Sequence, residues 1–220
     1  MSGALALLGG TFDPVHVGHL RAAIEAREAL GADEIRLMPC AVPPHREQPA
    51  VGPEQRLRML QAAIAGIPGL STDARELQRS GPSYTYDTLV SVRAEIGEQR
   101  PLVLVLGADA FAGLPSWHRW RELTDLAHIA VLTRPDAHSL IDPRLEDLLA
   151  SAGTADSSVL AASAAGQVLR LQIPPMPVSS TLVRTRLRQG RSVRFLVPDA
   201  VIDMIAQAGW YGAGDQVQRG

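Results

Sequence analysis

Two histidines three positions apart, His16 and His19, are the side chains of this sequence best suited to chemistry. They close the segment Gly9-Gly-Thr-Phe-Asp-Pro-Val-His-Val-Gly-His19. Imidazoles donate hydrogen bonds to phosphate oxygens, Gly9 and Gly10 let the backbone approach an anion, and Gly18 leaves room beside the rings. The spacing predicts phosphate chemistry. A zinc site is disfavoured, because no third ligand lies at a suitable spacing.

The elements around this segment place the histidines at a helix N-terminus. Residues 4–8 form a short aliphatic run typical of a buried strand, and residues 18–30 carry apolar side chains along one helical face. The free backbone N–H groups and the dipole of such a helix stabilise negative charge. The segment is therefore expected at the carboxyl ends of the strands of a parallel sheet, where anionic ligands bind.

Aliphatic runs and amphipathic stretches alternate along the chain, which predicts an α/β fold. We expect a Rossmann-like open parallel sheet with helices on both faces, as a single domain over residues 1–211 with a mobile tail at 212–220. The expected strands are 4–8, 34–39, 101–107, 129–133 and 167–173. The expected helices are 18–30, 54–65, 86–96, 143–150, 181–188 and 198–208.

The charge balance excludes several classes of protein. The chain has 220 residues with 21 basic and 23 acidic side chains, a net charge of -2, so it lacks the broad basic surface that binds a nucleic-acid backbone. All the basic residues are arginine, which excludes Walker-type and Schiff-base mechanisms that need lysine. The lone Cys40 forms no intrachain disulfide, and no apolar run reaches the ~20 residues of a membrane helix. We expect a cytoplasmic protein with no membrane or nucleic-acid partner.

A second candidate for phosphate binding is Ser179-Ser180-Thr181 with Arg184. The serines and threonine precede an expected helix and also suit a simple N-cap. Arg184 lies one turn further along, so its guanidinium can return to the same N-terminus. Hydroxyls, backbone N–H groups and guanidinium together suit the β- and γ-phosphates of a nucleotide.

These motifs resemble the nucleotidyltransferase superfamily, whose H-x-G-H signature matches His16-Val-Gly-His19. Further blocks resemble the bacterial nicotinate-nucleotide adenylyltransferases. They are Gly9 to Leu20, Pro43-Pro-His-Arg46, Gly81-Pro-Ser-Tyr-Thr-Tyr-Asp-Thr88, Gly107-Ala-Asp109 with Trp117, Thr133-Arg-Pro135 and Ser179-Ser-Thr-Leu-Val-Arg184. The resemblance implies transfer of AMP from ATP to nicotinate mononucleotide, giving deamido-NAD and pyrophosphate.

The resemblance and the residue chemistry together assign the site residues. His16, His19 and Arg184 are expected to be catalytic. The ATP-binding residues are expected to be Gly9, Gly10, Thr11, Phe12, Gly18, Gly107, Asp109, Ser179, Ser180 and Thr181. The residues expected to bind the nicotinate nucleotide are Arg46, Tyr84, Thr85, Trp117 and Arg134.

For the acceptor, the resemblance implies that Trp117 stacks on the pyridine ring with Tyr84 and Thr85 nearby. Trp120 is expected to pack the fold. Arg46 stands where the family more often has lysine, and a guanidinium still suits the acceptor's phosphate. Arg134 is equally compatible with a surface salt bridge. The proline-rich loop 40–53, which carries Arg46, is expected to close over the ligands.

The family uses magnesium, which we expect to arrive with ATP rather than in a site of the protein's own carboxylates. Asp13 suits an Asx turn beside Pro14 better than a metal-linked water. Two other functions stay open. One is an adenylyltransferase that prefers nicotinamide mononucleotide, and the other is a nucleotide sensor that binds without turnover.

Overall fold

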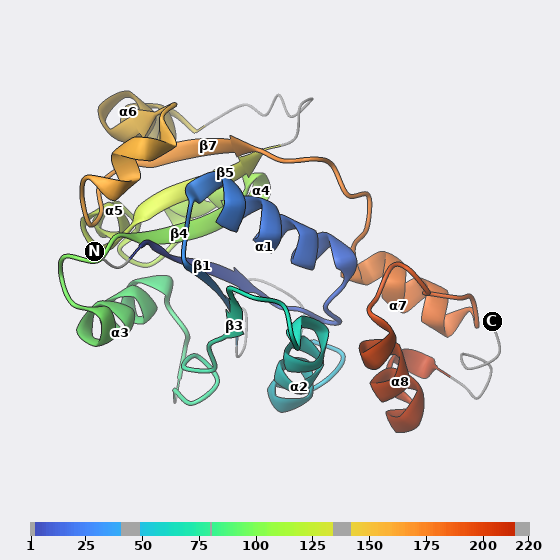
Figure 1. Cartoon of the computed structure of the whole chain (residues 1–220). Coiled ribbons are helices and arrows are strands. Elements are labelled where there is room, and N and C mark those ends of the chain that lie inside the picture. The colour runs from blue at the N-terminus through green and yellow to red at the C-terminus, as the bar shows by residue number, and fades with distance from the viewer. Residues whose placement is uncertain (1–2, 41–48, 80, 134–141, 214–220) are drawn as a thin grey trace.

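The computed structural model describes residues 3–40, 49–79, 81–133 and 142–213 (Figure 1). In the described chain, seven parallel strands form one sheet in the order β3-β2-β1-β4-β5-β7-β6. Their bounds are β1 Leu5–Gly10, β2 Glu34–Pro39, β3 Leu70–Thr72, β4 Leu102–Gly107, β5 His128–Thr133, β6 Gly153–Thr154 and β7 Val168–Gln172. The predicted open parallel sheet is confirmed.

Each central strand is covered on both faces of the sheet. Alternate residues along it therefore belong to two separate hydrophobic cores, one on each face. In β1, Ala6 and Leu8 belong to one core, whereas Leu5 and Leu7 belong to the other. This alternation is the two-residue period of a strand buried on both sides.

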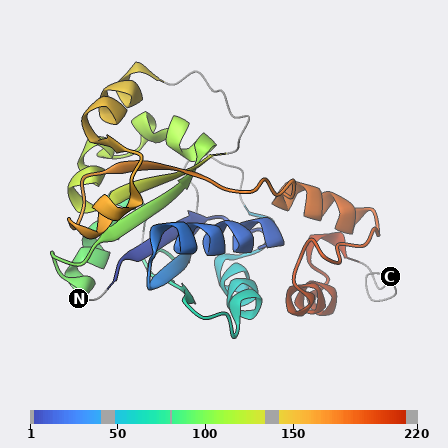
Figure 2. The same cartoon turned by 45° about the horizontal axis from the view of Figure 1, so that its top comes forward.

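Helices cover both faces of the sheet, as predicted. One core contains residues from α1, α2, α7 and α8, and the other contains residues from α3, α4, α5 and α6. The helices are α1 Val17–Leu30, α2 Pro53–Ile64, α3 Thr85–Ile96, α4 Ala108–Ala112, α5 Leu123–Leu126, α6 Pro143–Ala152, α7 Ser180–Arg188 and α8 Asp199–Ala208. Short 3-10 turns are η1 Leu114–Ser116, η2 Trp120–Glu122, η3 Ser157–Ala161 and η4 Trp210–Gly212. In two views, α7 and α8 lie beyond the end of the sheet toward which the strands point (Figures 1 and 2).

The order of the strands fixes where a ligand binds. β1 pairs with β2 on one side and with β4 on the other, so the order of connection reverses between β1 and β4. Ligands of open parallel sheets bind outside the carboxyl ends of the strands at such a point. The ends concerned are Gly10 of β1 and Gly107 of β4.

Several short elements were missed in the sequence. β3 and β6 have only three and two residues and lie at opposite edges of the sheet, so they carry no readable periodicity. The short helices α4 and η1, which follow Gly107 and bury Phe111 and Leu114, were not predicted either. The expected tail 212–220 lies largely outside the described residues, which end at residue 213.

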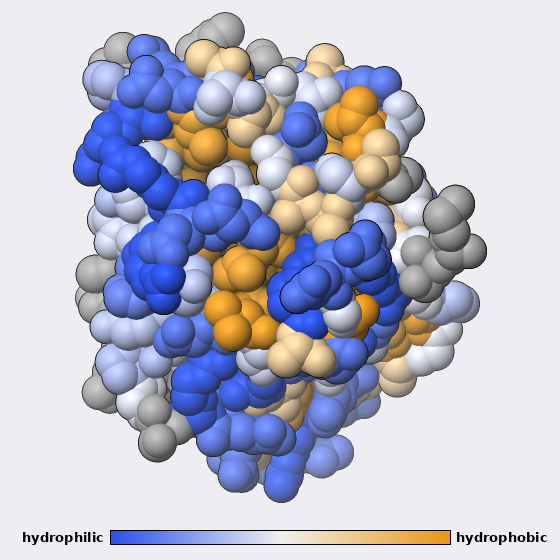
Figure 3. All heavy atoms as spheres, turned by 90° about the vertical axis from the view of Figure 1, so that its left-hand side faces the viewer, coloured by the Kyte–Doolittle hydropathy of each residue, from blue (hydrophilic) through white to orange (hydrophobic). Residues whose placement is uncertain are grey.

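The face seen from the side opposite α7 is mostly hydrophilic, with small groups of hydrophobic residues between hydrophilic ones (Figure 3). Apolar side chains scattered in this way are normal for a protein surface. In the described part of the chain, we find no helix of the length and hydropathy needed to span a bilayer.

Candidate active site

The histidine pair lies at the first turn of α1, beside the carboxyl end of β1. His16 is the N-cap of α1 in extended conformation and His19 is in its first turn. The two rings stack with centroids 3.7 Å apart and planes at 23°. The structure therefore brings together the two imidazoles that the sequence predicted to act on one anion.

Both imidazoles are neutral at pH 7. Burial lowers the pKa of His16 from 6.5 to about 4. Burial, with the nearby His16, lowers the pKa of His19 from 6.5 to about 3. Nδ1 of His19 accepts a 3.3 Å hydrogen bond from the backbone N–H of His16, so the ring proton of His19 stands on Nε2.

His16 has a polar atom that the described residues do not satisfy. Its side chain is 5% exposed, and Nδ1 has no hydrogen-bond partner among the residues that the structure describes. A Cβ at Gly18 would lie 3.0 Å from this nitrogen, which explains the glycine between the two histidines. Buried polar atoms are almost always hydrogen-bonded, so this one marks a place where a ligand or water contributes.

The other glycines serve two purposes. A Cβ at Gly9 or Gly107 would meet no atom within 4 Å, so the ends of β1 and β4 are open to a ligand. A Cβ at Gly10 would lie 2.9 Å from the ring of Phe12, so this glycine provides room for packing.

Phe12 supports the histidines from within the core. It has φ of +51° and is only 1% exposed. Its ring meets His19 edge-on, with centroids 5.0 Å apart. The exposed fraction is that of the whole residue, so contact of Phe12 with ATP stays a prediction.

Helix α7 brings the second phosphate motif to the same turn. Ser179 is the N-cap and accepts from the N–H of Leu182, so the capping role is confirmed. The hydroxyl of Ser180 donates to the carbonyl of Pro14 at 3.0 Å. Nη1 of Arg184 donates to the carbonyl of Asp13 at 2.7 Å, and Nη2 lies 3.4 Å from Oγ1 of Thr181. Arg184 thus returns to the helix N-terminus, as the spacing predicted.

Asp13 connects separate segments instead of forming the expected Asx turn. Its carboxylate is 4% exposed and accepts from the hydroxyl of Tyr211 at 2.8 Å and from the N–H of Ala50 at 2.9 Å. Its Oδ2 also lies 3.6 Å from Nη1 of Arg184. The long-range partners replace the local turn, because burial requires the carboxylate to be satisfied by whatever packs around it. Burial and the Asp13 carboxylate raise the pKa of Tyr211, which stays protonated as a donor.

Arg56 is a residue of this region that sequence reasoning missed. It is fully buried in α2, and its guanidinium donates to the carbonyl of Thr11 at 2.6 Å and to that of Cys40 at 2.8 Å. Arg56 therefore ties the ends of β1 and β2 together behind the histidine turn. The signal was present, because Arg56 falls on the same helical stripe as the buried Met59, Leu60 and Ala63.

Cys40 packs against the same turn. It is partly buried, and its Sγ lies 3.7 Å from Oγ1 of Thr11. Burial raises the pKa of this thiol, so it is protonated at pH 7. A packing role fits this environment.

Three of the candidate acceptor residues, Tyr84, Thr85 and Trp117, lie on the other face of the sheet. Tyr84 is the N-cap of α3, with no side-chain cap there, and Thr85 begins the helix. The ring of His118 lies 4.5 Å from that of Tyr84, which brings the neighbouring Trp117 to the start of α3. Trp117 is partly exposed and packs against the second core, whereas Trp120 is 8% exposed. The packing role of Trp120 is confirmed, and His118 is an addition that the sequence did not single out.

Of the remaining predicted residues, Asp109 lies within the described chain and two arginines lie outside it. Asp109 is exposed in the first turn of α4, just beyond the end of β4. Arg46, most of the loop 40–53 and Arg134 lie outside the described residues. Within the described residues, no group of three His, Cys, Asp or Glu side chains is arranged to hold a metal ion.

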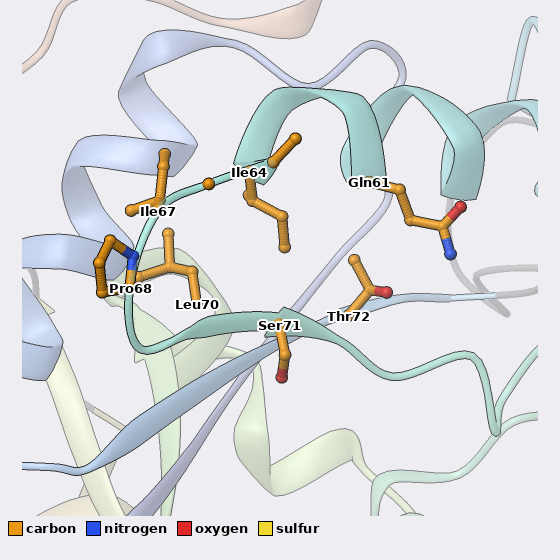
Figure 4. A pocket seen from close by; sticks show the side chains of 9 residues that line it. Gln61, Ile64, Ile67, Pro68, Leu70, Ser71 and Thr72 are labelled. Atoms are coloured by element: carbon orange, nitrogen blue, oxygen red, sulfur yellow. The ribbon is translucent and has the colours of Figure 1, made fainter.

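Two hollows of the described surface lie away from the histidine turn. One of about 520 Å³ lies between α2 and β3, with the aliphatic side chains of Ile64, Ile67 and Leu70 around it (Figure 4). Another of about 340 Å³ lies at the opposite edge, beside β6 and β7. None of their lining residues belongs to the predicted site, so they do not change its location.

Comparison with known proteins agrees with this geometry. The family profile described as Cytidylyltransferase-like matches residues 7–186. A Pseudomonas aeruginosa protein named "Probable nicotinate-nucleotide adenylyltransferase" is 52% identical over 205 residues, covering 93% of this chain and 95% of the relative. A Pseudomonas entomophila protein of the same name is 50% identical over 98% of this chain and 100% of the relative.

A solved structure of Plasmodium falciparum nicotinic acid mononucleotide adenylyltransferase, complexed with NaAD, shares the fold. It aligns with a TM-score of 0.71 at 17% identity, over 96% of this chain and 98% of the other. The profile match shows that the chain, with its parallel sheet and paired imidazoles at the first helix, is a nucleotidyltransferase of the cytidylyltransferase-like family. Within that family, the chain belongs to the nicotinate-nucleotide adenylyltransferases.

Proposed function

We propose that this chain transfers AMP from ATP to nicotinate mononucleotide and releases pyrophosphate, forming nicotinate adenine dinucleotide for NAD biosynthesis. The oxygen of the acceptor phosphate bonds to the α-phosphorus of ATP as the bond to the pyrophosphate oxygen breaks. The observation that carries the proposal is the stacked pair of neutral imidazoles at the first turn of α1, with Arg184 held at the same turn. The curated relatives support this choice of reaction.

The reaction needs no general base from the protein. A phosphate monoester has a second pKa near 6 and is mostly dianionic at pH 7. The barrier comes from bringing two anions together while charge develops on the departing pyrophosphate, so positioning and electrostatic stabilisation account for the catalysis. Nε2–H of His19 donates to the phosphate at the point of transfer, and His16 supplies a second buried donor.

Helix α7 holds the leaving group. Its first-turn N–H groups other than that of Leu182, the hydroxyl of Thr181 and the guanidinium of Arg184 converge on the β- and γ-phosphates. Binding of the triphosphate requires Arg184 to share or leave its contact with the Asp13 carbonyl. Magnesium enters on the triphosphate as part of the substrate, keeping most of its waters.

The backbone at the carboxyl ends of β1 and β4 binds ATP. Gly9, Gly10, Thr11 and Phe12 line one side of the crevice, and Gly107 with Asp109 lines the other. Gly9 and Gly107 leave room for the nucleotide, and the Asp109 carboxylate suits a ribose hydroxyl.

The start of α3 selects the acid over the amide. The first N–H groups of a helix lack partners within the helix, and no side chain caps α3 at Tyr84. Two such donors and the helix dipole match the two oxygens of the nicotinate carboxylate, whereas an amide presents an NH₂ group to them. Trp117 supplies a flat face for the pyridine ring, and Arg46 and Arg134 supply charge for the acceptor's phosphate. The consumption of ATP and the single, reduced Cys40 fit a cytoplasmic location.

A coupled assay of pyrophosphate release over a panel of mononucleotide acceptors tests the proposal. We expect kcat/KM for nicotinate mononucleotide to exceed that for nicotinamide mononucleotide by about tenfold or more, the factor that corresponds to ~1.4 kcal/mol. A preference of that size for the amide would assign the alternative adenylyltransferase. ATP binding in calorimetry, with no pyrophosphate release from either acceptor, would assign a sensor.

A further inference from the structure

A buried carboxyl group lies beneath the candidate acceptor site, and the reaction proposed above does not use it. Glu76, between β3 and α3, is 8% exposed. Its Oε1 accepts a 3.0 Å hydrogen bond from Oγ1 of Thr88, a fully buried residue of α3. Nη1 of Arg79 in turn donates to Oγ1 of Thr88 at 3.2 Å. Burial raises the pKa of Glu76, since desolvation disfavours its charged form.

The same residue also holds the chain on the other side of the acceptor segment. The hydroxyl of Ser83 donates to the backbone carbonyl of Glu76 at 3.3 Å. Ser83 precedes Tyr84 and Thr85, and Thr88 follows them by one helical turn, where its N–H donates to the carbonyl of Tyr84 at 3.1 Å. Glu76 therefore fixes both sides of the Tyr84–Thr85 segment.

A carboxyl group is a costly choice for packing alone, because its transfer from water into the interior is unfavourable unless its oxygens are satisfied. An apolar side chain of similar size would fill the space beneath α3 without that cost. What the Glu76 carboxyl group adds is direction, because its hydrogen bond from Thr88 holds one flank of the first turn of α3. The other flank is held by the backbone of the same residue, whose carbonyl accepts from Ser83. Sub-ångström placement of donor groups is what a bound carboxylate requires.

We propose that Glu76 is a positioning residue for the acceptor. Acting through Thr88, the carboxyl group of Glu76 sets the direction of the first N–H groups of α3 and so controls affinity for the nicotinate end and the preference for acid over amide. This inference rests on the proposed function and adds to it a residue that touches neither substrate.

Four single variants test the hydrogen bond between Glu76 and Thr88. Glu76→Ala and Thr88→Val remove it, whereas Glu76→Gln and Thr88→Ser retain an acceptor and a donor. We expect Glu76→Ala and Thr88→Val each to raise KM for nicotinate mononucleotide by about tenfold, the scale of one lost hydrogen bond, and to lower the acid-to-amide ratio of kcat/KM. KM for ATP should change by less than about twofold, and both conservative variants should stay within about threefold of the wild type.

The double variant Glu76→Ala with Thr88→Val separates a shared bond from two independent effects. If the residues act through one bond, the double variant raises the acceptor KM no more than either single variant. Additive effects would overturn the proposal. If Glu76→Ala fails to fold, a comparison of KM for nicotinate mononucleotide between Thr88→Val and Thr88→Ser provides the same test.

Asp73→Asn is the matched control. Asp73 is 7% exposed in the same segment, but its carboxylate accepts from Arg75 and lies 3.6 Å from Arg36. Arg75 contacts α3 at Ser91 and Glu95, away from the first turn of that helix. This variant should lower the melting temperature and leave the acceptor KM unchanged. An acceptor KM raised as much as in Glu76→Ala would mean general loosening of the segment and would overturn the positioning role. Failure of the proposed function is a separate outcome, since the wild type itself would then release no pyrophosphate with nicotinate mononucleotide.

Discussion

The hydroxyl of Tyr211 donates a 2.8 Å hydrogen bond to Oδ1 of Asp13, a residue 198 positions earlier in the chain. The backbone carbonyl of Asp13 accepts from Arg184, and its Oδ2 accepts from the N–H of Ala50. One buried carboxylate thus links η4, α7 and the loop before α2 to the turn that carries the histidines. The position of Arg184 at this turn depends on how Asp13 is held.

Replacing Tyr211 with phenylalanine should weaken both the fold and nucleotide binding. The variant leaves Oδ1 of a buried Asp13 without its donor, at a cost of about 1–3 kcal/mol in the free energy of unfolding. KM for ATP should rise more than KM for the acceptor, because Arg184 is held through Asp13. Urea denaturation and steady-state kinetics measure the two effects. Tyr86→Phe, in α3 on the other face of the sheet, is the control, and equal shifts of KM for ATP in both variants would contradict the prediction.

The central strands and helices were predictable because their patterns reflect burial. Residues 102–106 are apolar throughout since both faces of β4 are covered, and α1 ends at Gly31 in the left-handed conformation that glycine favours. β3 and β6 were not predictable, because two or three residues at a sheet edge establish no period. The histidine pair was predictable for a local reason, since both residues belong to one helix turn.

The long-range contacts that position the site residues were much harder to predict from the sequence than the strands and helices. Tyr211 and Asp13 meet only because α7 and α8 pack at the end of the sheet, and nothing in either local sequence indicates the other. Glu76 likewise depends on how the segment after β3 packs under α3. Arg56 differs, because an arginine on the apolar stripe of a helix already indicates a buried cation that needs acceptors.

Removing the imidazole of His19 should slow the chemical step. His19→Ala deletes a neutral donor placed by the backbone of His16, and loss of such a donor costs ~100- to 1,000-fold in kcat. KM for either substrate should change far less, because the donor acts mainly on charge that develops during transfer. Single-turnover measurement of pyrophosphate release checks the prediction. A fall confined to KM would place His19 in ground-state binding instead.

Removing the indole of Trp117 should act on the acceptor. Stacking of an aromatic base on a side chain contributes ~1–3 kcal/mol, so Trp117→Ala should raise KM for nicotinate mononucleotide by about fivefold to a hundredfold. Trp117→Phe, which keeps a flat ring, should recover most of the loss. Kinetics with each substrate varied in turn separates the acceptor from ATP. An effect on kcat alone, equal to that of His19→Ala, would be incompatible with a stacking role.

The buried histidines predict how stability depends on pH. Burial lowers the pKa of His16 from 6.5 to about 4 and that of His19 to about 3. As pH falls below 6.5, the unfolded chain takes up protons at both residues while the folded protein does not. The free energy of unfolding should therefore decline from pH 6.5 down to about 4 through His16, and further to about 3 through His19.

The double variant His16→Gln with His19→Gln isolates this contribution. It should show a shallower decline of the free energy of unfolding over the same pH range, measured by urea denaturation at each pH. His128 is also buried with a lowered pKa, but it is present in both proteins and cancels in the difference. Parallel pH curves for the two proteins would show that the imidazoles are not desolvated as the structure indicates.

Arg56 should matter to both stability and the histidine turn although it touches no substrate. Arg56→Met fills a similar volume but removes the donors to the carbonyls of Thr11 and Cys40, each costing about 1–3 kcal/mol when left buried without a partner. The exposed Arg58, in the same helix, provides the control in Arg58→Met. We expect a large fall in melting temperature and a lower kcat for Arg56→Met alone, because Thr11 precedes the turn that positions His16 and His19. Equal melting temperatures for the two variants would mean that the buried guanidinium does not hold the ends of β1 and β2 together.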